Sequence, residues 1–148
     1  MSIADVTGLE TLRRVQADPP ADFPPIRQLI GMTFDVVEPG RFVASLTTRP
    51  EYANPMGTVH GGIIATLLDT VMSCAVHTTL AAGVGYTTLE LKVNYVRPAQ
   101  TDGETLTGEG VVIHTGRRTA TAEGRVTDAS GRLIAHATTT CMLFEAAV

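Results

Sequence analysis

The sequence has no tryptophan, a single lysine (Lys92) and only two cysteines, and each scarcity argues against a class of protein. Eleven basic residues stand against fifteen acidic ones, which gives a formal net charge of −4. Nucleic-acid binding requires several cations on one face, and no basic cluster is present, so we expect no nucleic-acid partner. Cys74 and Cys141 lie in apolar segments without a CxxC spacing, which predicts reduced core residues and no disulfide.

Long hydrophobic runs and a targeting signal are also missing. No stretch reaches the roughly 18 uncharged apolar residues that a membrane-spanning helix requires. The start of the chain, MSIADVTGLETLRRV, lacks the apolar segment of a secretory signal peptide. We therefore expect a cytoplasmic protein without a membrane partner. A chain of 148 residues suits one domain with a core that needs neither disulfides nor metals.

The chain divides into an N-terminal helical extension, residues 1–25, and a single domain, residues 26–148. Apolar residues recur at helical spacing over residues 3–17, at Ile3, Val6, Leu9, Leu12 and Val15. Asp18-Pro19-Pro20 is expected to end this helix, and a second short helical turn is expected after Pro24-Pro25.

Within the main domain, strands are predicted on both sides of one long helix. Residues 32–38 and 41–48 flank Pro39-Gly40, a hairpin signal. Alternating or strand-like runs follow the helix at residues 86–96, 104–113, 118–127 and 133–144. Short turns at Thr115-Gly116 and at residues 128–131 indicate antiparallel hairpins.

The predicted long helix covers residues 61–82 and ends before Gly83 and Gly85. Its apolar residues have helical spacing, and the rest of its circumference is barely polar. A helix that is apolar nearly all round must be enclosed by other elements. The economical arrangement is an α+β fold, with an antiparallel β-sheet wrapped around a long central α-helix.

Asp69 is the only formally charged residue between Glu51 and Glu90, and it lies in the middle of this helix. An unpaired buried carboxylate is costly, so it must be neutralised, hydrogen-bonded or retained for function. Perturbed carboxylates concentrate at active sites, which favours a catalytic role. The alternative is that Asp69 faces a subunit boundary or a solvent gap and is simply hydrated.

Gly61 and Gly62 open the same helix, where the first-turn amides have no internal partners. Without side chains, these positions let a ligand carbonyl approach the N–H groups, as an oxyanion site requires. Alternatively, the glycines only permit tight packing of the helix on the sheet. Asp69 lies about 12 Å along the helix from Gly61, so the two residues of one chain cannot both contact one carbonyl. Two copies with antiparallel helices could supply one residue each.

The segment Asn54-Pro-Met-Gly-Thr-Val-His60-Gly61-Gly62, followed by Asp69, resembles the hotdog thioesterases of the phenylacetic-acid-degradation and 4-hydroxybenzoyl-CoA thioesterase type. The similarity runs from about residue 30 to residue 144 and leaves residues 1–25 outside it. The resemblance implies a hotdog fold, an acyl-CoA substrate and a homo-oligomer. In that assembly, dimers with shared sites pair into a homotetramer.

The resemblance also implies roles for individual residues. The Gly61 amide would polarise the thioester carbonyl, and Asp69 of the partner subunit would be the general base or the nucleophile. Asn54 would position water or the thioester, and His60 would support the loop and the substrate. Ser73 matches a hydroxyl that some relatives use beside the carboxylate. Thr88 falls where relatives carry a serine, so the hydroxyl is kept and a methyl group is added.

Plainer roles remain open for several of these residues. His60 could hydrogen-bond a loop carbonyl, and Asn54 could be a turn residue before Pro55. Candidate substrate-binding residues lie beside the helix start and at strand ends, where CoA phosphates could be bound; they are Gly62, Arg97, Arg117 and Arg118. The three arginines could equally be solvated. No metal is expected, since the spacing of the remaining histidines does not suit a metal site; these are His77, His114 and His136.

We therefore expect hydrolysis of an acyl-CoA with a hydrophobic or aromatic acyl group to the free acid and CoA, without a metal or redox cofactor. One rival is a hotdog hydratase or dehydratase acting on enoyl or 3-hydroxyacyl thioesters, although those enzymes pair a histidine and a carboxylate in a different pattern. A rival of another class is a non-catalytic acyl-CoA-binding module, against which the intact Asp69 argues.

Overall fold

A computed structural model describes residues 5–20 and 25–146. Helices and strands follow one another in the order α1 (Gly8–Ala17), α2 (Pro25–Ile30), β1 (Met32–Glu38), β2 (Arg41–Thr47), η1 (Pro50–Tyr52), α3 (Gly61–His77), β3 (Val84–Tyr95), β4 (Thr105–Thr115), β5 (Thr119–Thr127) and β6 (Leu133–Glu145). The predicted strands all occur, with boundaries that differ by a few residues at most. Ile3, placed at the start of the predicted N-terminal helix, lies outside the described residues.

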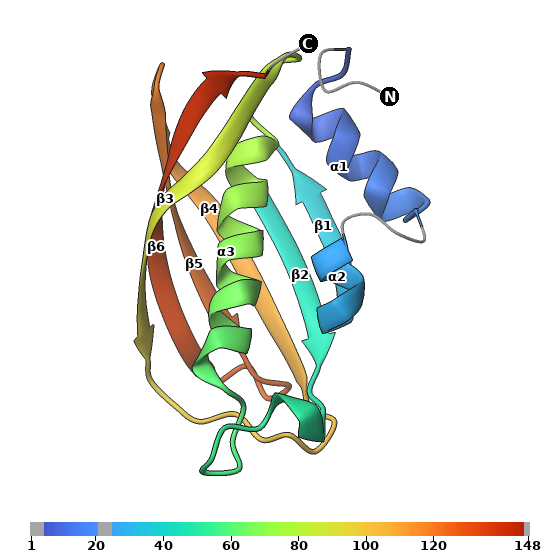
Figure 1. The fold of residues 1–148 in the computed structure, drawn as a ribbon, viewed down its shortest axis with the longest axis vertical. Helices are drawn as coiled ribbons and strands as arrows, with labels where there is room; N and C mark the ends of the chain where they lie inside the picture. The colour runs from blue at the N-terminus through green and yellow to red at the C-terminus, as the bar shows by residue number, and fades with distance from the viewer. Residues whose placement is uncertain (1–4, 21–24, 147–148) are drawn as a thin grey trace.

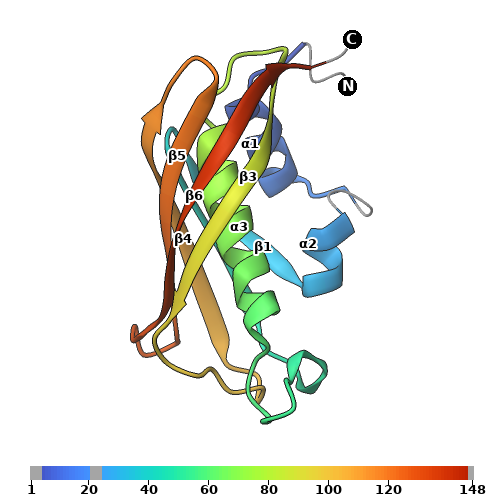
Figure 2. The ribbon, with the colours of Figure 1, turned by 60° about the vertical axis from the view of Figure 1, so that its left-hand side comes forward.

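The strands form one antiparallel sheet of six, in the order β1-β2-β4-β5-β6-β3. Figures 1 and 2 show this sheet curving around α3, which lies along its concave side. Leu67, Leu68, Val71, Met72 and Ala75 of α3 are completely buried in the core. The predicted sheet wrapped around a central helix is thus confirmed.

Glycines on the inner face of the sheet allow α3 to lie directly on the strands. A Cβ atom on Gly110 of β4 would overlap the backbone carbonyl of Val71. On Gly124 of β5, a Cβ atom would lie 2.8 Å from the Cγ atom of Met72. These two positions must therefore lack side chains for the helix to keep its depth in the sheet.

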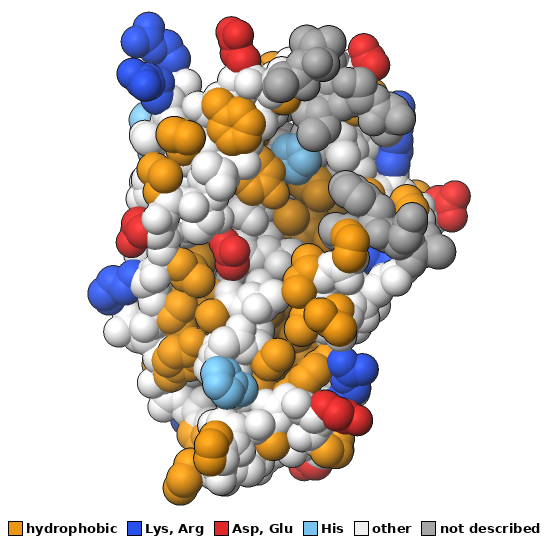
Figure 3. Space-filling view, viewed as in Figure 1, with side chains coloured by type: hydrophobic (Ala, Val, Ile, Leu, Met, Phe, Trp, Pro, Cys, Tyr) orange, Lys and Arg blue, Asp and Glu red, His pale blue; other side chains and the backbone are white. Residues whose placement is uncertain are grey.

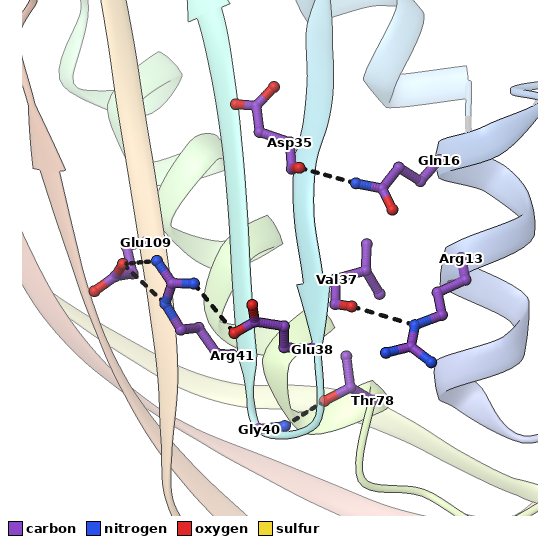
Figure 4. Close-up of polar contacts among 9 residues, drawn as sticks. All are labelled: Arg13, Gln16, Asp35, Val37, Glu38, Gly40, Arg41, Thr78 and Glu109. Carbon is purple, nitrogen blue, oxygen red and sulfur yellow. Dashed lines mark hydrogen bonds and ion pairs between the residues drawn. The ribbon is translucent and has the colours of Figure 1, made fainter.

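The central helix differs from its prediction in length and in enclosure. It ends at His77 rather than at residue 82, and Thr78 forms its cap. The Thr78 hydroxyl donates to the Ala75 carbonyl at 2.6 Å. It also accepts the Gly40 amide at 2.8 Å, as Figure 4 shows. This bridge ties the end of the helix to the β1–β2 turn. One side of α3, which includes Asp69, is only half-buried within the chain, so the sheet does not enclose it completely.

The N-terminal helix α1 packs along β1 and begins at Gly8 rather than at residue 3. A capping box starts it, in which the Thr7 hydroxyl accepts the Glu10 amide and the Glu10 carboxylate accepts the Thr7 amide. Val6 therefore precedes the helix. Figure 1 shows α1 and α2 beside α3, over the β1 edge of the sheet.

Candidate active site

Asp69 and Thr88 form the first part of the site. Asp69 is half-buried on α3, and the Thr88 hydroxyl on β3 donates a hydrogen bond to its Oδ1 atom at 2.9 Å. The register of β3 with β6 shifts between Thr88 and Glu90, a β-bulge that locally redirects the strand. Among the described residues no cation forms an ion pair with Asp69. The carboxylate that stands alone between Glu51 and Glu90 in the sequence is thus held by a hydroxyl donor.

The groups around this carboxylate are held in their neutral forms. Burial raises the pKa of the Cys74 thiol to about 12, and the charge of Asp69 adds to the effect. Burial also raises the pKa of Tyr86 and of Cys141, again with a smaller contribution from Asp69. Both cysteines are buried free thiols, as predicted. Asp69 therefore borders buried thiol and phenol groups that are held neutral.

Ser73 lies one helical turn after Asp69 and is 7% exposed. Its hydroxyl is directed at the Thr70 carbonyl oxygen of its own helix at 3.4 Å, rather than at Asp69. In this conformation Ser73 borders the carboxylate without hydrogen-bonding to it.

The start of α3 forms the second part of the site. His60 is the N-cap, and its Nδ1 atom accepts the Gly62 amide at 2.9 Å. Within the described part of the chain, the Gly61 amide has no hydrogen-bond acceptor. The Gly61 N–H is therefore open to a ligand, whereas the Gly62 N–H is already bonded to His60. Of the roles expected for His60, its bond to the Gly62 amide corresponds to support of the loop.

Tyr95 of β3 contacts Gly61, and sequence reasoning did not select it as a site residue. Its hydroxyl donates to the Gly61 carbonyl oxygen at 2.6 Å. A Cβ atom on Gly61 would lie 3.1 Å from the Tyr95 hydroxyl oxygen, so the missing side chain leaves room for this ring. Tyr95 and Gly61 are 34 residues apart in the sequence, and only the folding of the chain brings them together. The alternating pattern of the strand carried no signal for the contact.

The loop before α3 is shaped by Asn54. Its Oδ1 atom accepts the amides of Met56 and Thr58, and its Nδ2 atom donates to the Thr58 hydroxyl. These contacts are those of a turn-forming asparagine. Asn54, Gly61, Tyr95 and Arg97 are brought together along one hollow of about 330 Å³.

The three candidate arginines fall at opposite ends of α3. Arg97 borders the Gly61 hollow and donates one N–H to the Leu133 carbonyl at 2.9 Å. Arg117 and Arg118 are exposed in the β4–β5 turn. This turn lies beside the C-terminus of α3, because the hydroxyl of Thr115 is 3.3 Å from that of Thr79, which follows the helix. One chain thus brings Arg97, but not the other two arginines, to the Gly61 amide.

Each chain consequently places the candidate site residues in two separate groups along one helix. Eight residues separate Gly61 from Asp69, about 12 Å at the rise of an α-helix. Asn54, Gly61 and Arg97 meet at the helix start, whereas Asp69, Thr88 and Ser73 meet in its middle. A thioester carbonyl bound at the Gly61 amide of a chain is too far from the Asp69 of that same chain.

Across residues 5–20 and 25–146, no three histidine, cysteine or acidic side chains gather in a way that could hold a metal ion. No helix in these ranges combines the length and the apolar character needed to cross a membrane.

Comparison with known proteins gives the family. Residues 56–135 match the family model described as the thioesterase superfamily. Human acyl-coenzyme A thioesterase 13 is 30% identical over 110 residues, which cover 74% of this chain and 77% of the human protein.

Solved structures agree with this match. A phenylacetic acid degradation-related protein from Ralstonia eutropha JMP134 is 30% identical and superposes with a TM-score of 0.79, covering 88% of this chain and 97% of that one. The E. coli PaaI protein shares the fold at 18% identity, with a TM-score of 0.81 over 98% of both chains. The chain belongs to the thioesterase superfamily, as a thioesterase with the hotdog fold of the PaaI type.

Proposed function

We propose that the protein hydrolyses an acyl-CoA thioester to the free acid and CoA, with Asp69 as the catalytic carboxylate. The observation that carries this proposal is the Asp69–Thr88 pair, a half-buried carboxylate oriented by a hydroxyl at 2.9 Å. The open amide of Gly61 supplies the second requirement, a backbone donor for the developing oxyanion. Human acyl-coenzyme A thioesterase 13, a relative at 30% identity, supports CoA as the carrier.

The chemistry has two forms that use the same residues. As a general base, Asp69 takes a proton from water, the resulting hydroxide attacks the carbonyl carbon, and the C–S bond breaks to release CoA thiolate, which is then protonated. As a nucleophile, Asp69 forms an acyl anhydride as the thiolate leaves, and water then hydrolyses it. In both forms the Gly61 N–H stabilises the oxyanion, and the reaction requires no cofactor beyond water.

The active unit in this proposal is a homodimer, because one chain keeps the two groups of site residues apart. The β3 strand pairs only with β6 in the described chain, so its other edge is free. Leu89, Tyr95 and Val96 beside that edge are 56%, 52% and 53% exposed. Antiparallel pairing of two β3 strands would cover these side chains and place Gly61 of one copy near Asp69 of the other. We further propose that two such dimers pair into a tetramer.

CoA is assigned to the Gly61 end of the site. Arg97 borders that hollow and keeps guanidinium N–H groups beyond the one bound to Leu133. Arg117 and Arg118 belong to the other end of α3, so in an antiparallel dimer the partner's copies of these residues are the ones to consider. Phosphate binding by these three arginines follows from their bidentate donor geometry.

The test is replacement of Asp69 by asparagine, which keeps the shape of the side chain and removes the charge. We expect kcat to fall by at least about 100-fold, the usual scale for losing a positioned acid–base group. Thiol release from acyl-CoA measures kcat, and circular dichroism with thermal unfolding checks the fold. Asp102→Asn, at an exposed loop carboxylate, is the matched control and should keep wild-type turnover. Wild-type turnover by Asp69→Asn would show that the assignment is wrong.

The same assay separates the rival functions. A non-catalytic binding module would bind acyl-CoA without releasing thiol. A hydratase would instead change the absorbance of an enoyl-CoA and leave the thioester intact. Thiol release from the wild-type protein at a rate lost in Asp69→Asn is the outcome expected of a thioesterase.

A further inference from the structure

Tyr95 ends β3 beside the start of α3 and presents its hydroxyl there. Leu91 and Val93, which share its face of the strand, pack against the core. Figure 3 shows hydrophobic side chains gathered over this part of β3, at the left of the view. Burial raises the pKa of the Tyr95 phenol, so the hydroxyl keeps its proton at neutral pH. It is therefore a neutral donor, and it donates to the Gly61 carbonyl.

The peptide group that joins Gly61 to Gly62 is held at both of its polar atoms. Its carbonyl oxygen accepts the Tyr95 hydroxyl at 2.6 Å, and its N–H donates to Nδ1 of His60 at 2.9 Å. In the preceding peptide group, the His60 carbonyl accepts the Ile63 amide at 2.9 Å. Among the described residues, the Gly61 N–H is thus the one polar group of these two peptide units without a partner, and its direction is set by the bonds that hold the other three.

The glycines alone would not keep this N–H in one direction. Gly61 and Gly62 lack the Cβ atoms that restrict backbone rotation, and the first amides of a helix have no intrahelical acceptor. A donor stabilises a developing oxyanion best when its direction is fixed before the reaction. We propose that Tyr95 is a positioning residue, whose hydroxyl holds the Gly61–Gly62 peptide group and so aims the Gly61 N–H at the thioester oxygen. This inference rests on the proposed thioesterase function.

The space around Gly61 fits this role. A Cβ atom on Gly61 would lie 3.1 Å from both the Cζ atom and the hydroxyl oxygen of Tyr95, which is tighter than ordinary van der Waals contact. Tyr95 also borders the hollow of about 330 Å³ at the Gly61 amide, so a ligand bound there meets its ring. Phenylalanine would keep the ring and remove only the hydroxyl, which makes Tyr95→Phe a test of the hydrogen bond alone.

Tyr52→Phe is the matched control. The Tyr52 hydroxyl also donates to a backbone carbonyl, that of Ile30 in α2. Both variants lose one bond from a phenol to a carbonyl, so a merely structural effect should appear in each. The values of kcat and KM are measured by thiol release from butanoyl-, octanoyl-, phenylacetyl- and palmitoyl-CoA. Thermal unfolding and size-exclusion chromatography check the fold and the assembly.

In Tyr95→Phe, kcat for the best substrate should fall about tenfold, less than the roughly 100-fold or more that removal of an oxyanion donor costs, because the N–H remains and loses only its fixed direction. KM and the assembly should stay as in the wild type. Tyr52→Phe should keep its kcat even if it melts at a lower temperature. An unchanged kcat in Tyr95→Phe, a rise in KM alone, or an equal loss of kcat in both variants would overturn the inference and leave thioesterase activity standing. Absence of thiol release by the wild type from all four substrates would overturn the proposed function, and the inference with it.

Infrared spectroscopy reports the polarisation of the carbonyl without turnover. A CoA ketone, in which a methylene group replaces the thioester sulfur, cannot be hydrolysed, and an isotope label on its carbonyl carbon isolates the carbonyl band in difference spectra. Bound to Tyr95→Phe, this band should lie at a higher frequency and be broader than in the wild type and in Tyr52→Phe, because the N–H then donates in several directions. The same band in all three proteins would overturn the positioning role of Tyr95.

Discussion

From the neighbouring strand, Thr88 donates a hydrogen bond to one oxygen of the Asp69 carboxylate, and in the proposed reaction the other oxygen is the one that acts. A hydrogen bond to a charged group contributes about 1.5–3 kcal/mol, which corresponds to roughly tenfold or more in rate if it is lost in the transition state. We therefore predict that Thr88→Val lowers kcat by about tenfold or more. Thr88→Ser restores the hydroxyl and should stay within about threefold of the wild type.

Thr87 provides the control for this prediction, because it is exposed and points to the opposite face of β3. Thr87→Val should leave kcat unchanged. A loss in Thr88→Val that Thr88→Ser does not recover would mean that packing of the side chain, rather than its hydroxyl, affects turnover. Equal activity of all three variants would remove Thr88 from the site.

At the scale of single residues, the sequence predicts which side chains are chemically unusual better than it predicts which residues they contact. The isolated charge of Asp69 in a long apolar segment marked it as exceptional. The resemblance selected Thr88 as a site residue, but its hydrogen bond to Asp69 was not predicted. The Tyr95–Gly61 contact was not foreseen, because it joins positions 34 residues apart through the curvature of the sheet. Asn54 and His60 carried two readings each, and only hydrogen-bond geometry shows that both shape the loop and the helix start.

The close packing of α3 on the sheet depends on glycines, because there is no room for a side chain at these positions. We predict that Gly110→Ala destabilises the protein by about 3 kcal/mol, the upper part of the range for overpacking, because its Cβ atom would meet backbone rather than a movable side chain. For a domain of this size the melting temperature should fall by roughly 10 °C. Thermal unfolding by circular dichroism measures the shift.

Val111→Ala serves as the comparison, since Val111 follows Gly110 on β4 and points away from α3. Its melting temperature should change by only a few degrees. A Gly110→Ala protein that melts with the wild type would show that α3 can rise from the sheet without cost.

Element positions were predictable from periodicity, whereas element ends were not. The alternating strands and the long apolar helix appear where the pattern placed them. The helix α3 ends at His77, and the Thr78 hydroxyl that follows accepts the Gly40 amide, a contact across 38 residues that no local signal reports. The start of α1 at Gly8 was predictable in principle, because Thr7 and Glu10 form the spacing of a capping box.

At the scale of the whole molecule, the proposed reaction requires groups from two copies of the chain. The two groups of site residues lie about 12 Å apart on one rigid helix, and the free edge of β3 carries exposed apolar side chains. In the proposed homodimer, two-fold symmetry would give two complete sites, because an isologous interface repeats each contact. The separation of Gly61 and Asp69 follows from helix geometry, and the free edge of β3 supplies a surface on which the pairing can occur.

The shared site predicts rescue between two inactive proteins. Asp69→Ala removes the carboxylate, and Gly61→Pro removes the amide donor at the first position of α3, where proline is compatible with a helix. In a mixed dimer, one interface site carries both lesions and the other carries neither. After subunit exchange, activity should therefore return to about a quarter of the wild type, since half of the dimers are mixed and each holds one intact site.

If each chain held a complete site, every site would carry one lesion and mixing would restore nothing. Mass spectrometry of differently tagged chains must show that exchange has occurred. Thermal unfolding must show that Gly61→Pro is folded, because the Tyr95 ring lies close to Gly61 and a proline ring could displace it. With exchange and folding established, absence of rescue would contradict the shared site while leaving Asp69 as the carboxylate of a single-chain enzyme. Rescue near a quarter would instead require that Gly61 and Asp69 act from different subunits.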